Sequence, residues 1–269
     1  MNSSVNQITL PIWLDNYIYN ELGGKYCKVN SDMTVIDWDK SNILNYLGTY
    51  FPRSYAEAIY IFNGLFNNRD IDFSDKEELN VFDFGCGTGG EIIGLLTVIV
   101  DKFENIRNVN ISAFDGNHHS LRLFERVLEN FKKVNNLKLS ITPRIIPTKI
   151  DDFYDMSVLE SVIDSNFDII MTFKAICEFV TKQQFESKNP YKHFIDTFIS
   201  KINKNGLLLI EDVTTKNTVS QEWLVEILDR AIMNYNIINR NSDYNQAIFV
   251  SHSKKENDVS KVAWRIIKQ

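Results

Sequence analysis

Cysteine is scarce in this sequence, which has only Cys27, Cys86 and Cys177 among its 269 residues. The three lie far apart, and no CxxC pair or mixed cluster of cysteine and histidine is present. A disulfide framework and a structural zinc site are therefore excluded as organising features, and no metal site is expected. Isolated thiols of this kind favour a reducing, cytoplasmic location.

Long apolar runs and an excess of positive charge are also missing. No stretch of about 18 apolar residues occurs, so neither a membrane-spanning helix nor a membrane partner is expected. Lys and Arg number 29 against 35 for Asp and Glu, which gives a net charge of −6. This balance offers no footprint for a long phosphate backbone, so RNA is not the default partner, although it stays open as one.

Residues 1–75 are predicted to form a mostly helical cap. The segments SNILNYLGTYF and SYAEAIYIFNGLF place apolar residues at helical spacing. Pro52 stands between them and suits the first turn of a second helix. We expect this cap to fold back over the ligand site of the domain that follows it.

From residue 80 onward the sequence alternates between strands and amphipathic helices. Such βαβ units predict a parallel sheet that is covered by helices on both faces. The last two strands, QAIFVSHS and KVAWRIIKQ, are separated only by the polar segment KKENDVS, so we expect them to form an antiparallel hairpin. The predicted fold is α/β, with a doubly wound, mostly parallel, seven-stranded sheet in a domain over residues 76–269.

A glycine cluster follows the first strand of this domain, in VFDFGCGTGG at residues 81–90. Glycine at a strand end lets the backbone approach a ligand closely. The segment resembles the first motif, hhDhGxGxG, of class I S-adenosylmethionine-dependent methyltransferases, whose sheet also ends in an antiparallel hairpin. The resemblance implies S-adenosylmethionine as cofactor, with binding residues Asp83, Gly85, Cys86, Gly87 and Gly89. Two alternatives stay open, because the glycines also fit the GxGxxG of dinucleotide-binding proteins or a purely structural turn.

The second strand ends in an acid, in ISAFDGN at residues 111–117. The resemblance implies that Asp115 binds the ribose hydroxyls, because a carboxylate accepts from two O–H groups at once, and that Gly116 lets the chain turn against the cofactor. The alternative is that Asp115 only caps the helix starting near Asn117.

After the third strand, the segment KIDDF covers residues 149–153. The resemblance implies Asp151 or Asp152 near the adenine amino group and Phe153 against the ring, with Phe173 of the fourth strand also at the cofactor. The alternative is an exposed acidic turn with Phe153 in the core.

The acceptor side is expected around FDIIMTFKAICEF, residues 167–179. This segment has neither [DNS]-PP-[YFW] nor Pro-Cys, which argues against base or glutamine-amide N-methylation and against cytosine C5 chemistry. Lys174 and Glu178 are four positions apart, so they face the acceptor together or form an ion pair at a helix start. The predicted catalytic residues are Lys174, Glu178 and Asp212, and the predicted substrate residues are Arg53 and Tyr55.

The implied reaction is in-line transfer of the sulfonium methyl group to a small molecule or a protein. A weaker resemblance covers NYLGTYFPRSYAEAIYIF at residues 45–62, which is similar to the leader of a methyltransferase-like family associated with small ribosomal subunits. It leaves two alternatives, a ribosome-associated RNA methyltransferase and a cofactor-binding assembly factor without catalysis. The acidic balance and the lack of a downstream cysteine cluster depart from that family.

Overall fold

The computed structural model describes residues 7–27, 40–135, 138–163, 165–217, 219–240 and 245–269. Its strands are β1 (Gln7–Thr9), β2 (Glu78–Phe84), β3 (Asn108–Phe114), β4 (Ser140–Ile146), β5 (Phe167–Phe173), β6 (Ile202–Val213), β7 (Ile237–Arg240), β8 (Gln246–His252) and β9 (Lys255–Lys268). Its helices are α1 (Ile12–Asn16), α2 (Lys40–Asn67), α3 (Gly90–Lys102), α4 (His118–Asn135), α5 (Ser157–Val162), α6 (Ile176–Phe179), α7 (Lys182–Lys188), α8 (Pro190–Phe198) and α9 (Leu224–Ile232), with a π-helical turn η1 (Tyr17–Glu21) and a 3-10 turn η2 (Ile199–Lys201).

All strands belong to one sheet in the order β1-β8-β9-β6-β5-β2-β3-β4, with β7 also paired to β9. The run from β4 to β6 is parallel throughout. β9 lies antiparallel to β6, and β8 lies antiparallel to β9. The predicted α/β fold with its C-terminal hairpin is therefore confirmed. In the part of the chain that the structure describes, the sheet has nine strands rather than seven, because β1 and β7 are too short to give an alternating pattern in the sequence.

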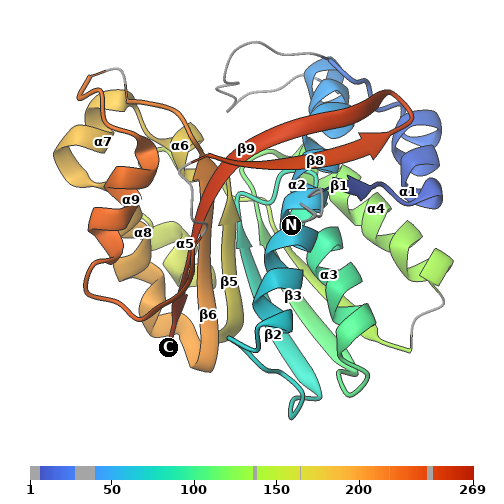
Figure 1. Cartoon of the computed structure of the whole chain (residues 1–269), viewed down its shortest axis with the longest axis horizontal. Helices are drawn as coiled ribbons and strands as arrows, with labels where there is room; N and C mark the ends of the chain where they lie inside the picture. Colours follow the sequence, from blue (N-terminus) through green and yellow to red (C-terminus); the bar gives the residue numbers. More distant parts are fainter. Residues whose placement is uncertain (1–6, 28–39, 136–137, 164, 218, 241–244) are drawn as a thin grey trace, which may run out of the picture.

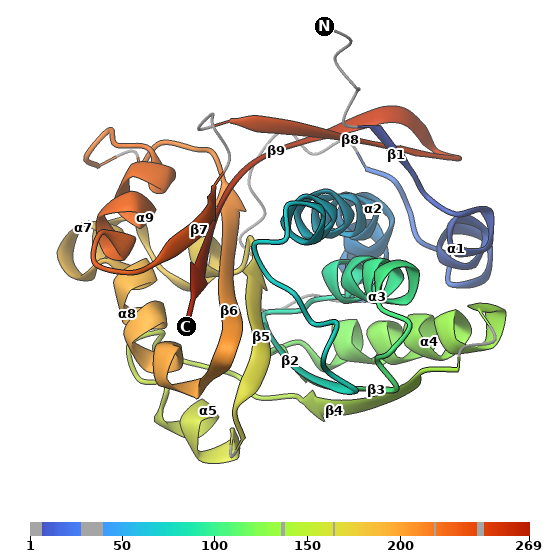
Figure 2. The ribbon, with the colours of Figure 1, turned by 60° about the horizontal axis from the view of Figure 1, so that its bottom comes forward.

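Helices cover both faces of the parallel strands, as predicted (Figures 1 and 2). α2, α3 and α4 lie on one face, and α5, α8 and α9 lie on the other. α4 illustrates why, since its buried residues Leu121, Phe124, Val127 and Phe131 recur every three or four positions and so share one side of the helix.

The leader contains one long helix where the sequence predicted two. α2 runs through Pro52 without a break. A proline has no N–H, so the carbonyl four residues earlier, at Gly48, loses its helical partner. That carbonyl accepts the Tyr19 hydroxyl at 2.6 Å instead, which satisfies the group that usually makes an internal proline costly.

The leader also packs on the C-terminal hairpin, which reaches across α2 (Figure 2). β1 pairs in parallel with β8, so the leader is not entirely helical. The segment predicted as a polar turn is mostly strand, because β9 begins at Lys255. Asp258 within that segment is buried and accepts two hydrogen bonds from Arg53, at 2.8 and 2.9 Å. The ion pair explains how one buried acid comes to lie in this otherwise exposed part of β9.

One cluster of buried side chains extends from Leu10 in the leader to Ile266 in β9. The boundary proposed near residue 75 falls in the loop between α2 and β2. Among the described residues, no helix has the length and apolar character needed to cross a membrane.

Candidate functional site

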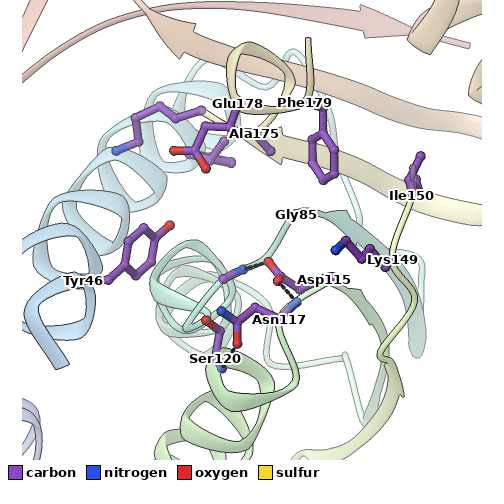
Figure 3. A pocket seen from close by; sticks show the side chains of 14 residues that line it. Tyr46, Gly85, Asp115, Asn117, Ser120, Lys149, Ile150, Ala175, Glu178 and Phe179 are labelled. Atoms are coloured by element: carbon purple, nitrogen blue, oxygen red, sulfur yellow. Dashed lines mark hydrogen bonds between the residues drawn. The ribbon is translucent and has the colours of Figure 1, made fainter. Parts of the chain in front are cut away.

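A pocket lies at the carboxyl ends of β2 and β5, where the strand order reverses direction. In open α/β sheets this switch point is where ligands bind. The pocket contains about 660 Å³ of empty space, including its open mouth. It is lined by Tyr46, Gly85, Gly87, Asp115, Gly116, Asn117, Ser120, Lys149, Ile150, Phe173, Lys174, Ala175, Glu178 and Phe179 (Figure 3).

The glycine cluster forms the loop between β2 and α3. Gly85, Gly87 and Gly89 have φ values of +76°, +50° and +79°, a region that favours glycine. Close packing by the chain itself also requires glycine, because a Cβ on Gly85 would lie 2.4 Å from Cβ of Ala175 and one on Gly89 would lie 2.1 Å from the Phe124 ring. Gly85 and Gly87 line the pocket, while Gly89 begins α3 against Phe124.

Asp115 joins this loop to the end of β3. Its carboxylate accepts the Gly87 N–H at 2.8 Å and the Asn117 N–H at 2.7 Å, as the dashed lines in Figure 3 show. Burial raises the pKa of Asp115 to about 6, although both N–H groups favour the charged form. The helix that follows is capped by Asn117, whose side chain accepts the N–H groups of His119 and Ser120, so Asp115 is not its cap.

The loop after β4 supplies Lys149 and Ile150 to the pocket. The next three residues, which were predicted to bind the cofactor, are not among those that line it. Asp151 and Asp152 are exposed, and Asp152 accepts the N–H of Tyr154. Phe153 is buried against Phe84 and Phe179. The alternative of an exposed acidic turn with Phe153 in the core therefore describes the structure. The residues of this loop that line the pocket lie nearer to β4 than the predicted ones.

β5 delivers Phe173 and Lys174 to the pocket, and the short α6 adds Glu178. Lys174 has a φ of +54° and precedes α6, so it and Glu178 do not share a regular helical turn. The Lys174 ammonium forms an ion pair with Glu57 of α2 at 2.6 Å. Of the two alternatives, the ion pair with Glu178 does not describe Lys174, which pairs with Glu57, and both Lys174 and Glu178 line the pocket.

The leader reaches the pocket through Tyr46, not through Arg53 or Tyr55. Arg53 is held by Asp258, and Tyr55 is buried under α3, where its carbonyl lies 2.6 Å from the position of a Cβ on Gly94. Tyr46 lies against Gly87, and burial and the nearby Glu178 raise the pKa of its phenol well above the usual value. The expectation that Arg53 and Tyr55 face the site is wrong, because the middle of α2 packs on α3 and β9.

Three other predicted residues are not among those that line the pocket. The side chain of Asp212 lies on the face of the sheet that α8 covers, where its carboxylate accepts a hydrogen bond from the Tyr191 hydroxyl at 2.8 Å. Cys86 is buried. Its burial raises the pKa of the thiol, and the nearby charge of Asp83 raises it further. Asp83 is also buried, behind the glycine loop.

Several residues that line the pocket, or are buried next to its lining residues, were not predicted from the sequence. Asn117 had a signal, because an Asn directly before an amphipathic helix is a common N-cap. Glu57 and Glu91 also had one, since each is a lone acid in an otherwise apolar helical stretch. Tyr46, Ile150 and Phe179 had none, since an aromatic or aliphatic residue at helical spacing predicts only burial.

No family model matches the chain, and no curated protein matches it. Solved structures with a similar chain course include TehB from Haemophilus influenzae, with 14% identity, a TM-score of 0.44 and coverage of 78% of this chain and 61% of TehB. A putative class I S-adenosylmethionine-dependent methyltransferase from Listeria monocytogenes has 10% identity, a TM-score of 0.45 and coverage of 79% and 59%. The rRNA methyltransferase aviRa from Streptomyces viridochromogenes has 13% identity, a TM-score of 0.43 and coverage of 80% and 84%. The chain thus spans about three fifths of the length of the first two.

Proposed function

We propose that this chain is an S-adenosylmethionine-dependent methyltransferase that transfers the methyl group in line to a small molecule or a protein. The observation that carries the proposal is the Asp115 carboxylate at a pocket whose floor is the glycine loop. Asp115 ends the strand next to the one that carries the hhDhGxGxG motif, and the two meet at the switch point of the sheet.

The polar and apolar groups at this pocket fit a nucleoside. Each oxygen of Asp115 accepts one backbone N–H, and a carboxylate has about four acceptor positions, so capacity remains for two ribose hydroxyls. Ile150, Phe173 and Phe179 offer apolar surface for a flat ring. We assign ribose binding to Asp115 and ring packing to Ile150 and Phe179, in place of Asp151, Asp152 and Phe153.

When bound, S-adenosylmethionine supplies a sulfonium methyl group, and the pair of electrons in the broken S–C bond stays on sulfur. The chain's contribution is mainly alignment, which is worth up to about 7–11 kcal/mol when reacting atoms are held in contact. Figure 3 shows Tyr46 and Glu178 pointing into the same space. We assign both residues to the binding of the methyl acceptor. Tyr46 donates a hydrogen bond that orients the acceptor, and Glu178 takes up the proton that the acceptor loses.

Calorimetry with S-adenosylmethionine and with NAD tests the cofactor assignment. Asp115→Ala should weaken S-adenosylmethionine binding by about 1.5–3 kcal/mol, or roughly 10- to 150-fold, as expected for lost hydrogen bonds to a charged group. Asp151→Ala is the matched control, because this exposed acid is not among the lining residues and its loss should leave the affinity unchanged. Tighter binding of NAD, or equal effects of the two variants, would refute the assignment.

Transfer of a labelled methyl group tests the acceptor class. Small-molecule, protein and RNA fractions of a cell extract are each incubated with the chain and labelled S-adenosylmethionine. Label in the small-molecule or protein fraction supports the proposal, and label in RNA supports the ribosomal alternative. Cofactor binding without label in any fraction supports the assembly-factor alternative.

A further inference from the structure

Tyr46 and Glu178 point into the pocket from two separate elements (Figure 3). Tyr46 belongs to α2, and Glu178 belongs to α6, which has only four residues. Burial raises the pKa of the Tyr46 phenol, and the nearby charge of Glu178 raises it further. An acceptor held between these two side chains therefore depends on how α2 and α6 are placed relative to each other.

The position of α2 is fixed by close packing on α3, the helix that follows the glycine loop. A Cβ on Gly90 would lie 2.5 Å from the Phe51 carbonyl oxygen, and one on Gly94 would lie 2.6 Å from the Tyr55 carbonyl oxygen. Glycine at both positions lets the two helix backbones approach each other closely. Glu57 lies in this part of α2, and its side chain is fully buried. Its carboxylate is therefore presented by a helix that cannot shift without breaking these contacts.

The segment that carries Glu178 begins at Lys174, in an unfavourable backbone conformation. Lys174 has a φ of +54°, where a residue other than glycine is strained, and such strain persists only where neighbouring groups hold it. Two contacts do so here. The N–H of Lys174 donates to the Glu211 carbonyl at 2.9 Å, and the ammonium contacts Oε2 of Glu57 at 2.6 Å. The second contact ties the turn between β5 and α6 to α2.

The ion pair also decides what Lys174 can do chemically. Burial lowers the pKa of Lys174, but the charges of Glu57 and Glu211 outweigh burial and raise it above the usual value. The amine therefore stays protonated, whereas a general base must be free to take up a proton. Lys174 thus lines the pocket without being suited to remove a proton from an acceptor.

We propose that Lys174 is a positioning residue, whose ion pair with Glu57 ties the turn between β5 and α6 to α2 and so sets the separation of Glu178 and Tyr46 across the pocket. The inference rests on the proposed function, because that function places the methyl acceptor between these two side chains. It goes beyond the proposed function by assigning the ion pair a role in turnover.

Glu57→Gln tests the tie from the end that does not line the pocket, so every residue that lines the pocket keeps its side chain. Turnover is measured with labelled S-adenosylmethionine and a saturating amount of the cell-extract fraction that accepts label. We expect turnover to fall about 10- to 100-fold, because a misplacement of about 1 Å between reacting groups has an effect of this size. The affinity for S-adenosylhomocysteine, measured by calorimetry, should stay nearly unchanged, because Asp115 and Ile150 do not depend on the pair.

Glu57→Asp separates the charge of this residue from its mere presence. It keeps the carboxylate, and the flexible side chain of Lys174 can follow a group that is one methylene shorter. Most of the turnover should therefore return in Glu57→Asp. A purely structural role of the side chain would not distinguish these two variants by their turnover at equal melting temperature.

NMR of isotope-labelled tyrosine measures the separation of the two side chains without any acceptor. The Tyr46 ring signal is assigned by its loss in Tyr46→Phe. Glu178→Gln should shift this signal in the wild type, because it removes a nearby charge. The same substitution should shift the signal by less than half as much in the Glu57→Gln background, where the turn is no longer tied to α2.

Lys76→Met is the matched control. It breaks the pair of Lys76 with the buried Asp168, at 2.8 Å, which lies at the opposite end of β5. Turnover and the Tyr46 signal should not change in this variant, and melting temperatures show that each variant is folded.

Full turnover of Glu57→Gln, an equal loss in Lys76→Met, or a Tyr46 shift that Glu57→Gln leaves unaltered overturns the inference and leaves the proposed function standing. If the wild-type chain transfers no label to any fraction, the proposed function fails. The Tyr46 signal then still decides whether the ion pair sets the separation.

Discussion

The ion pair between Lys174 and Glu57 should respond unequally to the loss of its two members. Lys174→Met leaves the carboxyl groups of Glu57, Glu91 and Glu211 buried together without a cation, and removing one partner of a buried pair costs about 3–5 kcal/mol. Glu57→Gln leaves the ammonium beside Glu211, whose oxygens have no other partner in the described chain, so we expect a cost of only about 1–2 kcal/mol. Methionine has a Cβ as lysine does, so the positive φ at this position adds no difference between the variants.

The cost of Lys174→Met should also depend on pH. The Coulombic attraction of Lys174 lowers the pKa values of Glu91 and Glu211, so its loss raises folded-state values that already lie above the unfolded ones. An acid with a raised folded-state pKa loses stability as pH rises from its unfolded value of about 4.3 to its folded value. Because the wild-type pKa of Glu91 is already about 8, the added cost appears only as pH approaches and passes that value, and it should be about 1 kcal/mol larger at pH 9 than at pH 5.5.

Urea unfolding followed by circular dichroism at the two pH values measures these costs, with the double variant closing a mutant cycle. The m-value must stay constant for the comparison to hold. Equal costs of the two single variants, or a cost of Lys174→Met that does not change with pH, would refute the account of Glu57, Glu91 and Glu211 as buried acids in excess over the one cation beside them.

Two further predictions concern the backbone. Gly89→Ala should lower the free energy of unfolding in urea by about 2–4 kcal/mol, because it combines a positive φ with a clash against Phe124. Gly64→Ala, in α2 with no atom within 4 Å of the new Cβ, should instead stabilise by up to about 1 kcal/mol. A harmless Gly89→Ala would contradict the loop packing. Pro52→Ala restores an N–H for the Gly48 carbonyl, so the loss of unfolding free energy caused by Tyr19→Phe should be about 1 kcal/mol smaller in that background than in the wild type. Strict additivity in the mutant cycle would show that the Tyr19 hydroxyl is not the substitute partner of that carbonyl.

The architecture could be predicted because it depends on patterns along the chain. Strands that alternate with helices, a glycine cluster at the first strand end and two final strands without a helix between them lead to the observed sheet. β1 was missed because three residues carry no period. The unbroken α2 was missed because the partner of the Gly48 carbonyl, Tyr19, is 29 positions away and nothing local reveals it.

The site could be predicted where it follows strand ends, and it could not where it depends on packing between elements. Gly85, Gly87, Asp115, Phe173 and Lys174 line the pocket because each comes at or just after the carboxyl end of a parallel strand. The side of the sheet to which Asp212 projects, and the turn of α2 that reaches the loop, depend on register and helix rotation. A single sequence leaves both of these open, which is why Arg53 and Tyr55 were expected in place of Tyr46.

The pairing of β1 with β8, and of Arg53 with Asp258 across 205 positions, has a consequence for biosynthesis. On a ribosome, the glycine loop and all five parallel strands emerge before the hairpin that anchors the leader. The strands can assemble at that stage, while α2 still lacks its contacts with β8 and β9. At that stage α2 can already pack on α3 and place Tyr46 against Gly87, and the hairpin adds the contacts of α2 with β8 and β9 afterwards.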